Sequence, residues 1–186
     1  TDERTGRRIA KLLEVPAFYP DMVLEGGAID VDGEGTLLCT EQCLLTGTQA
    51  RNRKLGRRGT ERALRDYLGA DKVIWLGDGI AGDDTGGHVD DFARFVAPGV
   101  VVVAEEKNRK DPNYRPLREA AERLRGARDA RGRRLEVIRL PMPQPVVFGG
   151  ERLPASYANF YIGTGAVLVP TFNDPNDRVA LGILSD

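Results

Sequence analysis

The chain has 186 residues, of which 41% are hydrophobic and 30% are charged, with a formal net charge of −1. This length accommodates one good core or two small ones, and the composition is that of an ordinary soluble globular protein. Because 27 basic residues balance 28 acidic ones, charge gives no reason to expect nucleic acid or an anionic membrane as partner, and no apolar run approaches the ~20 residues of a membrane span.

Both ends of the chain look like cuts in a longer reading frame. Thr1 is not an initiator methionine and no apolar signal core follows it, while no closing element is evident before Asp186. Cys39 and Cys43 are too few for a disulfide framework, which predicts a reducing cytoplasmic compartment. Both thiols lie in an apolar run, so we expect them to be small buried groups and not nucleophiles.

Hydrophobic periodicity and turn residues divide the chain into short elements. The first half is predicted to contain a helix at 5–14, a strand at 22–25 broken by Gly26-Gly27, a hairpin at 28–31 and 36–40, a helix at 59–68, a strand at 72–76 and a loop at 77–87. The second half is predicted to contain a strand or helix at 89–96, a strand at 100–104 covered on both faces, a helix within 111–129, a strand at 135–140, a hairpin at 156–162 and 166–169, and a helix at 175–184 capped by Asp174. Two of the helices have a clear inward face, formed by Ala63, Leu64, Tyr67 and Leu68 in the first and by Leu117, Ala120, Ala121 and Leu124 in the second.

The order of these elements indicates the fold class. A strand pair, helix and strand are followed by a strand, helix and strand pair, in units of roughly 50–65 residues. This order predicts an α/β repeat rather than a Rossmann sheet. The glycine fingerprint of a dinucleotide site and the Walker loop are both absent from the sequence, so no nucleotide cofactor is expected.

His88 is the only histidine and the one side chain that titrates near neutral pH without help. Two glycines precede it, and carboxylates at Asp83, Asp84 and Asp90 flank it, with Asp91 beyond. In a strand, His88 and Asp90 would point to the same face, where they can shuttle a proton and hold a cation together. The alternative is an ordinary surface or core histidine.

Two further acidic features have competing interpretations. Glu25 precedes Gly26-Gly27, which lets a substrate come near, but it could equally be a solvated strand end. A second set of acids nearly fits a calcium-binding loop: Asp30, Asp32, Glu34 and Glu41. A calcium loop of this kind needs a helix on each side, whereas residues 23–29 are predicted to be a strand with a Gly-Gly break, so a hairpin turn is the preferred interpretation.

Several motifs occur in the same order as in a known family: Leu24-Glu25-Gly26-Gly27, Val31-Asp32-Gly33-Glu34-Gly35-Thr36, Thr40-Glu41-Gln42-Cys43-Leu44-Leu45, Tyr67-Leu68-Gly69, Lys72-Val73-Ile74-Trp75-Leu76, Asp84-Thr85-x-Gly87-His88-Val89-Asp90, Ala93-Arg94-Phe95-Val96-Ala97-Pro98-Gly99, Leu140-Pro141-Met142-Pro143 and Ala155-Ser156-Tyr157-x-Asn159-Phe160-Tyr161. From about residue 20 to about residue 180 the chain resembles the agmatine deiminases, a family that includes the Porphyromonas-type peptidylarginine deiminases.

The resemblance implies the pentein fold, an α/β-propeller of five modules with a central active site. Residues 1–186 would then be a partial pentein domain that lacks N-terminal and C-terminal modules. The implied activity is hydrolysis of agmatine to N-carbamoylputrescine and ammonia through an amidino-cysteine, in putrescine and polyamine synthesis, with no cofactor and no metal. His88 resembles the general acid/base, Asp90 the carboxylate that grips the guanidinium, Glu25 and Asp84 the acids that help to hold substrate, and Cys43 a structural cysteine.

The family's Gly-Gly-Gly-Asn-x-His-Cys segment, which supplies the nucleophile, has no counterpart in this chain and is expected after residue 186. A tryptophan- and Arg-Asp-containing segment is expected before residue 1. The chain alone is therefore expected to be inactive, and the resemblance leaves open a homo-oligomer of the full-length enzyme.

Four positions depart from the usual agmatine deiminase pattern: Asp30 replaces His, Asp84 replaces Glu, Gly86 replaces Asp and Asp91 replaces Asn. A protein- or peptidyl-arginine substrate is therefore the alternative within the family, although the acid-rich loop favours the free amine of agmatine. A non-catalytic or calcium-binding α/β module is the alternative outside it.

Overall fold

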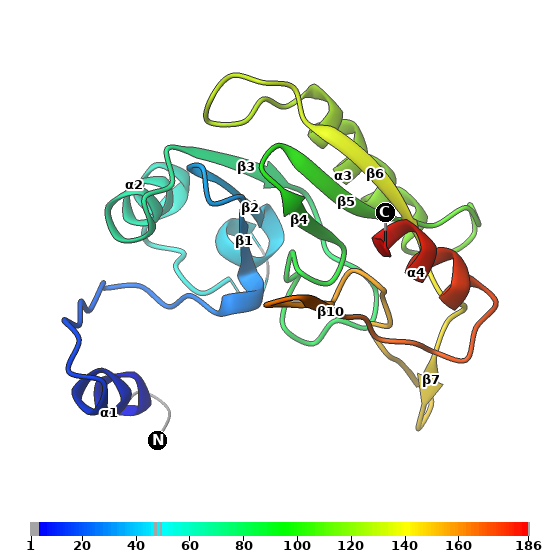
Figure 1. Cartoon of the computed structure of the whole chain (residues 1–186), viewed down its shortest axis with the longest axis horizontal. Coiled ribbons are helices and arrows are strands. Elements are labelled where there is room, and N and C mark those ends of the chain that lie inside the picture. The colour runs from blue at the N-terminus through cyan, green and yellow to red at the C-terminus, as the bar shows by residue number, and fades with distance from the viewer. Residues whose placement is uncertain (1–3, 47, 49, 186) are drawn as a thin grey trace.

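Two sheets of identical topology form the body of the chain, whose computed structural model describes residues 4–46, 48 and 50–185. In each, an antiparallel hairpin is followed by a helix and a third strand parallel to the second. The first unit consists of β1 (Ile29–Val31), β2 (Thr36–Thr40), α2 (Gly56–Leu68) and β3 (Lys72–Leu76). The second consists of β4 (Ala93–Ala97), β5 (Val100–Glu105), α3 (Tyr114–Gly126) and β6 (Glu136–Pro141), and lies beside the first (Figure 1).

The predicted α/β repeat is confirmed, but the predicted order of its second unit is wrong. The segment 89–96, for which the sequence allowed either a strand or a helix, contributes to the strand β4. This strand pairs with β5 through the tight turn at Pro98-Gly99. The second unit therefore begins with a hairpin, as the first does. The predicted hairpin at 156–169 is a separate and shorter pair, β9 (Tyr161–Gly163) and β10 (Ala166–Leu168).

Residues 22–25 do not form the predicted strand. The backbone of Val23 instead pairs with the side-chain amide of Asn52, which accepts from the Val23 N–H at 2.9 Å and donates to its carbonyl at 2.6 Å. A side chain thus satisfies the groups that a neighbouring strand would have bonded. Gly26–Ala28 then makes a single 3₁₀ turn that leads into β1.

The main core packs α3 against the second sheet and also includes Leu38, Ile74 and Leu76 of the first sheet. Val101, Val102 and Val103 of β5 are buried, as the absence of a polar face predicted. The four residues predicted to face inward from α3 are all buried, namely Leu117, Ala120, Ala121 and Leu124. In α2 the prediction is only partly confirmed: Leu64 is buried together with Thr60, whereas Tyr67 and Leu68 are about half exposed.

The remaining elements flank this body. A π-turn spans Gln42–Thr46, β7 (Val147–Phe148) pairs with β8 (Glu151–Arg152), and α4 (Asn176–Ser185) closes the described chain. The predicted cap of α4 is confirmed, because Asp174 Oδ1 accepts the Asn176 N–H at 2.8 Å.

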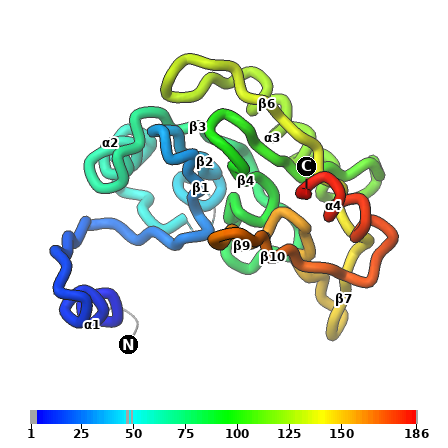
Figure 2. Tube along the Cα trace, viewed as in Figure 1, coloured from blue at the N-terminus to red at the C-terminus, as the bar shows by residue number. Residues whose placement is uncertain are grey.

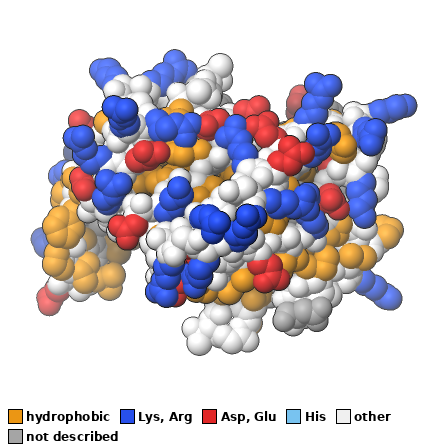
Figure 3. Space-filling model, turned by 90° about the horizontal axis from the view of Figure 1, so that it is seen from above, with side chains coloured by type: hydrophobic (Ala, Val, Ile, Leu, Met, Phe, Trp, Pro, Cys, Tyr) orange, Lys and Arg blue, Asp and Glu red, His pale blue; other side chains and the backbone are white. Residues whose placement is uncertain are grey.

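α1 (Thr5–Leu12) projects from one end of the molecule and buries none of its residues. Several apolar side chains in this helix and just after it are exposed, namely Ile9, Leu12, Leu13 and Phe18. Figure 3 shows apolar side chains gathered on the surface at its left. Elsewhere on that face basic and acidic side chains are interspersed. Among the described residues no helix combines the length and the apolar character that crossing a membrane requires.

Candidate functional site

The loop of residues 83–90, here called the histidine loop, meets the 3₁₀ turn at Gly27. The Gly27 carbonyl accepts the N–H groups of Val89 at 3.1 Å and Asp90 at 3.3 Å. A Cβ on Gly27 would lie 2.6 Å from His88 Nδ1 and 2.7 and 2.8 Å from the two Asp90 oxygens. His88 and Asp90 therefore lie on the same side, although the residues form a turn and not the strand that would have predicted it.

Glu25 faces the other nitrogen of the same ring. His88 Nε2 and Glu25 Oε2 lie 3.9 Å apart, which is too long for a hydrogen bond. The second oxygen, Glu25 Oε1, accepts from Arg51 Nε at 2.8 Å, and Arg51 also donates to the Thr85 carbonyl at 2.7 Å. Arg51 thus fixes Glu25 and joins it to the histidine loop.

Asp83 organises that loop. Its carboxylate accepts the N–H of Thr85 at 2.7 Å, of Gly87 at 2.6 Å and of His88 at 3.0 Å, as well as the Thr85 hydroxyl. Burial alone would raise the pKa of Asp83, but these hydrogen bonds outweigh it and lower the pKa below its usual value. Asp83 is therefore ionised and holds the backbone on which His88 is carried.

Replacement of Asp83 by asparagine should lower the free energy of unfolding at neutral pH by about 1–2 kcal/mol, since a neutral amide accepts these bonds less strongly and partial exposure screens the charge. Because the folded pKa is depressed, this stabilisation is present above the unfolded pKa and is lost as the pH falls through the folded pKa. Urea unfolding of both proteins at neutral and acidic pH checks this; an equal difference at both pH values would contradict it.

Asp90 faces an open hollow of about 630 Å³ that is lined also by Gly26, Arg94, Asn159 and Tyr161. Tyr161 of β9 and Leu168 of β10 belong to its lining as Gly26 does. Figure 2 shows the β9–β10 hairpin beside the chain segment that leads into β1. Burial raises the pKa of Asp90, while the nearby His88 and Arg94 act to lower it. A cation that enters the hollow would lie against this carboxylate.

Arg94 holds the far wall of this hollow. It donates to Asp30 at 2.7 Å and to the Phe160 carbonyl at 2.8 Å, and its guanidinium stacks on the Phe160 ring at 4.9 Å. Because Asp30 belongs to β1 and Arg94 to β4, this ion pair also joins the two units.

Asp91, next to the site, is almost fully buried. Its Oδ1 accepts from Asn159 Nδ2 at 2.7 Å. Burial raises the pKa of Asp91 to about 7, and the charges of Asp83, Asp90 and Asp84 add to the effect. Its carboxyl group is thus a poor anion at neutral pH.

Asp84 and the two cysteines lie apart from the groups described above in exposure or in protonation. Asp84 is exposed in the histidine loop, where Asp83 and not Asp84 makes the bonds that order the backbone. Cys39 and Cys43 are buried free thiols, as predicted. Burial raises the pKa of Cys39 well above its usual value and that of Cys43 to about 11, so neither is a thiolate at neutral pH.

The calcium loop is not formed, because its four acids point to different partners. Asp32 Oδ1 caps the hairpin turn by accepting the N–H groups of Glu34 and Thr36, at 2.7 and 2.9 Å. The other three acids bind arginines: Asp30 binds Arg94, Glu34 binds Arg133 and Glu41 binds Arg123. The hairpin interpretation is confirmed.

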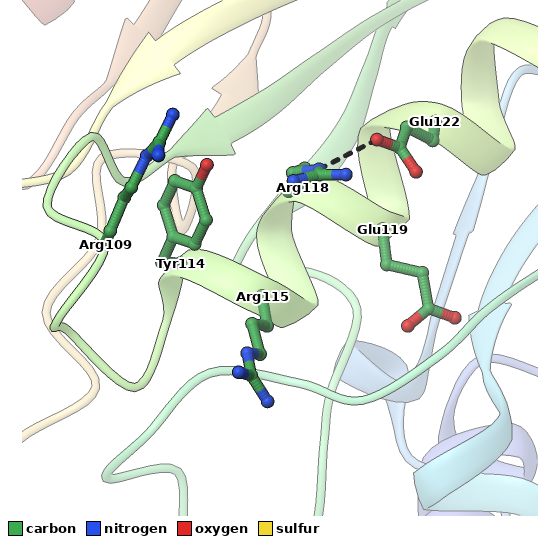
Figure 4. Close-up of a pocket in the computed structure, with 6 residues that line it drawn as sticks. All are labelled: Arg109, Tyr114, Arg115, Arg118, Glu119 and Glu122. Atoms are coloured by element: carbon green, nitrogen blue, oxygen red, sulfur yellow. Dashed lines mark hydrogen bonds and ion pairs between the residues drawn. The ribbon is translucent and has the colours of Figure 1, made fainter.

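A second hollow, of about 590 Å³, lies on the outer face of α3 (Figure 4). Long charged side chains line it, among them Arg115 and the exposed pair Arg118–Glu122. His88, Asp90 and Glu25 are not among its lining residues. Exposed ion pairs such as Arg118–Glu122 contribute little binding energy.

Three contributors to the candidate site were not predicted from the sequence: Arg51, Asp83 in its role of ordering the histidine loop, and Asn159. Arg51 and Asn159 reach the site from distant segments, so their sequence neighbourhood gives no signal. Asp83 could have been found, because an aspartate followed by Thr85 two residues later is typical of a side chain that caps its own turn.

The fold and the site together define a mixed α/β protein of the pentein type, with a histidine and carboxylates gathered where repeated modules meet. The Porphyromonas-type peptidyl-arginine deiminase family matches residues 1–186, and the chain belongs to it. The agmatine deiminase of Pseudomonas aeruginosa (strain UCBPP-PA14) is 42% identical over 98% of this chain and 54% of its own length.

Solved structures agree. The agmatine deiminase of Enterococcus faecalis matches with a TM-score of 0.91 at 39% identity, over 99% of this chain and 55% of the other. A cysteine-to-serine variant of C. jejuni agmatine deiminase with substrate bound matches with a TM-score of 0.88 at 33% identity, over 99% of this chain and 54% of the other. The chain thus spans about half the length of the relatives it matches.

Proposed function

We propose that residues 1–186 are the guanidinium-binding and proton-transfer part of a guanidine deiminase, a partial pentein domain within a longer enzyme. The observation that carries this proposal is the convergence of His88, Asp90 and Glu25 around Gly27. Relatives named agmatine deiminase, one of them with substrate bound, support agmatine as the substrate.

Each residue has a role that follows from its place. The planar guanidinium offers several N–H donors, and the Asp90 carboxylate in the lining of the hollow can accept two of them. Glu25 Oε2 lies 3.9 Å from His88 Nε2, where it can stabilise the imidazolium that forms when the histidine acts as general base. Asp84, exposed on the loop, would meet the substrate from outside the site.

The nucleophile of the amidino-cysteine step is not supplied by Cys39 or Cys43, which are buried and protonated. It would come from polypeptide outside these residues. The products would be N-carbamoylputrescine and ammonia, in a cytoplasmic route to putrescine that needs no cofactor. Protein- or peptidyl-arginine is the second candidate substrate, favoured by the family match and by Arg51, a cation beside the site.

Calorimetric titration of the 186-residue chain tests this assignment. Agmatine is expected to bind more tightly than L-arginine, and putrescine, which has an amine but no guanidinium, should bind at least about tenfold more weakly than agmatine. A colorimetric assay for ureido product should show no turnover. Equal binding of putrescine would contradict the guanidinium site, tighter binding of arginine would favour the second candidate, and turnover above blank would contradict an external nucleophile.

A further inference from the structure

Two buried polar atoms in the site lack partners. Within the described part of the chain, neither Glu25 Oε2 nor His88 Nε2 has a hydrogen bond, although both are shielded from solvent. They face each other at 3.9 Å, outside hydrogen-bond range. An unsatisfied buried polar atom costs about 1–3 kcal/mol, so such a pair calls for a ligand that would use both.

Cys43 completes a set of three donors around the same point. One ligand atom each of Glu25, Cys43 and His88 lies within 4.8 Å of the other two. Glu25 directly precedes the 3₁₀ turn, Cys43 lies in the π-turn and His88 lies in the histidine loop. Thr40 joins the last two segments, because its Oγ1 donates to the Gly87 carbonyl at 2.5 Å and accepts the Cys43 N–H at 3.1 Å. The Gly27 carbonyl joins the 3₁₀ turn to the histidine loop. The fold therefore holds the three donors together without a metal.

The donor chemistry selects one class of ion. Magnesium and calcium prefer oxygen donors alone, whereas one thiolate, one imidazole and one carboxylate suit a tetrahedral zinc ion with an open fourth position. Bonds of about 2.0–2.3 Å in a tetrahedron place ligand atoms about 3.3–3.8 Å apart. Because the three donors lie within 4.8 Å of one another, they would close by about 1.5 Å at most.

We infer that Glu25, Cys43 and His88 form a binding site for a zinc ion that excludes substrate from the histidine. The Cys43 thiol gives its proton to solvent as the sulfur–zinc bond forms, and no electron is transferred. Arg51 binds the opposite oxygen of Glu25, so it orients the carboxylate and leaves Oε2 to the metal. The positive charge of Arg51 should keep affinity below that of a four-ligand structural site.

The metal site rests on the three side chains alone, and only its inhibitory consequence rests on the proposed deiminase function. Cobalt(II) tests the site without any activity measurement, because a cysteine ligand adds a sulfur-to-metal charge-transfer band. The 186-residue chain is expected to show this band with one equivalent of cobalt, and zinc should abolish it by displacement.

Variants make the assignment specific. Cys43→Ser should remove the band, whereas Cys39→Ser, a matched buried cysteine outside the set, should keep it. Glu25→Gln, at a half-buried position, should weaken cobalt binding at least about tenfold while circular dichroism shows an intact fold. No band in the parent chain, a band that survives Cys43→Ser, or a band lost in Cys39→Ser would overturn the site. A cobalt band in a chain that does not bind agmatine would support the metal site and contradict only the proposed deiminase function.

Discussion

Gly27→Ala is expected to abolish agmatine binding by the chain. The new methyl group would lie 2.6 Å from His88 Nδ1 and under 3 Å from both Asp90 oxygens, so both proposed site residues must move. Displacement by about 1 Å can cost about 100-fold in function, and the overpacking should also lower stability by about 1–3 kcal/mol. Calorimetry with agmatine and urea unfolding measure the two effects.

Gly126→Ala is the matched control. A Cβ at Gly126, at the end of α3, meets no atom within 4 Å, and neither glycine has a positive φ, so backbone strain does not distinguish the two. Gly126 does not line the hollow, so Gly126→Ala should keep binding within a few-fold of the parent chain. Equal loss in both variants would mean that the crowding of His88 and Asp90 does not govern binding.

Asp91→Asn is expected to stabilise the chain at alkaline pH. A rise in pKa from the usual 3.8 to about 7 corresponds to about 4 kcal/mol, and we expect about 2–4 kcal/mol after structural relaxation. The asparagine carbonyl can still accept the bond from Asn159. The variant thus removes a buried charge and keeps its hydrogen bond.

The raised pKa of Asp91 determines how its contribution to the free energy of unfolding changes with pH. Because the folded state holds its proton more tightly than the unfolded chain, Asp91 lowers stability as the pH rises from about 4 to about 7. The gain from Asp91→Asn should be near zero at about pH 4 and reach its full value at about pH 8. Urea unfolding at both values checks this, with the exposed Asp84→Asn as control; a gain that does not depend on pH would contradict the account.

The sequence predicted those elements whose signals are local. The run at 100–104 has no polar face and became the buried β5, and Asp32 and Glu34 fell in a hairpin turn as their glycines indicated. The prediction of a strand at 22–25 was wrong because the backbone of Val23 is bonded by the Asn52 side chain, 29 residues away in the sequence. Periodicity cannot reveal a partner of that kind.

The site divides in the same way. His88 and Asp90 could be predicted as neighbours because the only histidine of the sequence lies among carboxylates within a few residues. Arg51 was not found, because its contacts with Glu25 and Thr85 depend on how the π-turn and the histidine loop pack. The proximity of Cys43 to His88 likewise depends on the Thr40 bridge, so a sequence motif could not have suggested a shared ligand.

The most direct test of the proposed site follows from His88 being the only histidine, so its ring gives a single resolved set of NMR signals. Titration with agmatine should shift these signals saturably, putrescine should not, and Asp90→Asn should weaken the response at least about tenfold by removal of a charge-assisted contact. A ring that does not respond to agmatine, or responds equally to putrescine and in Asp90→Asn, would contradict a guanidinium site at His88 and Asp90.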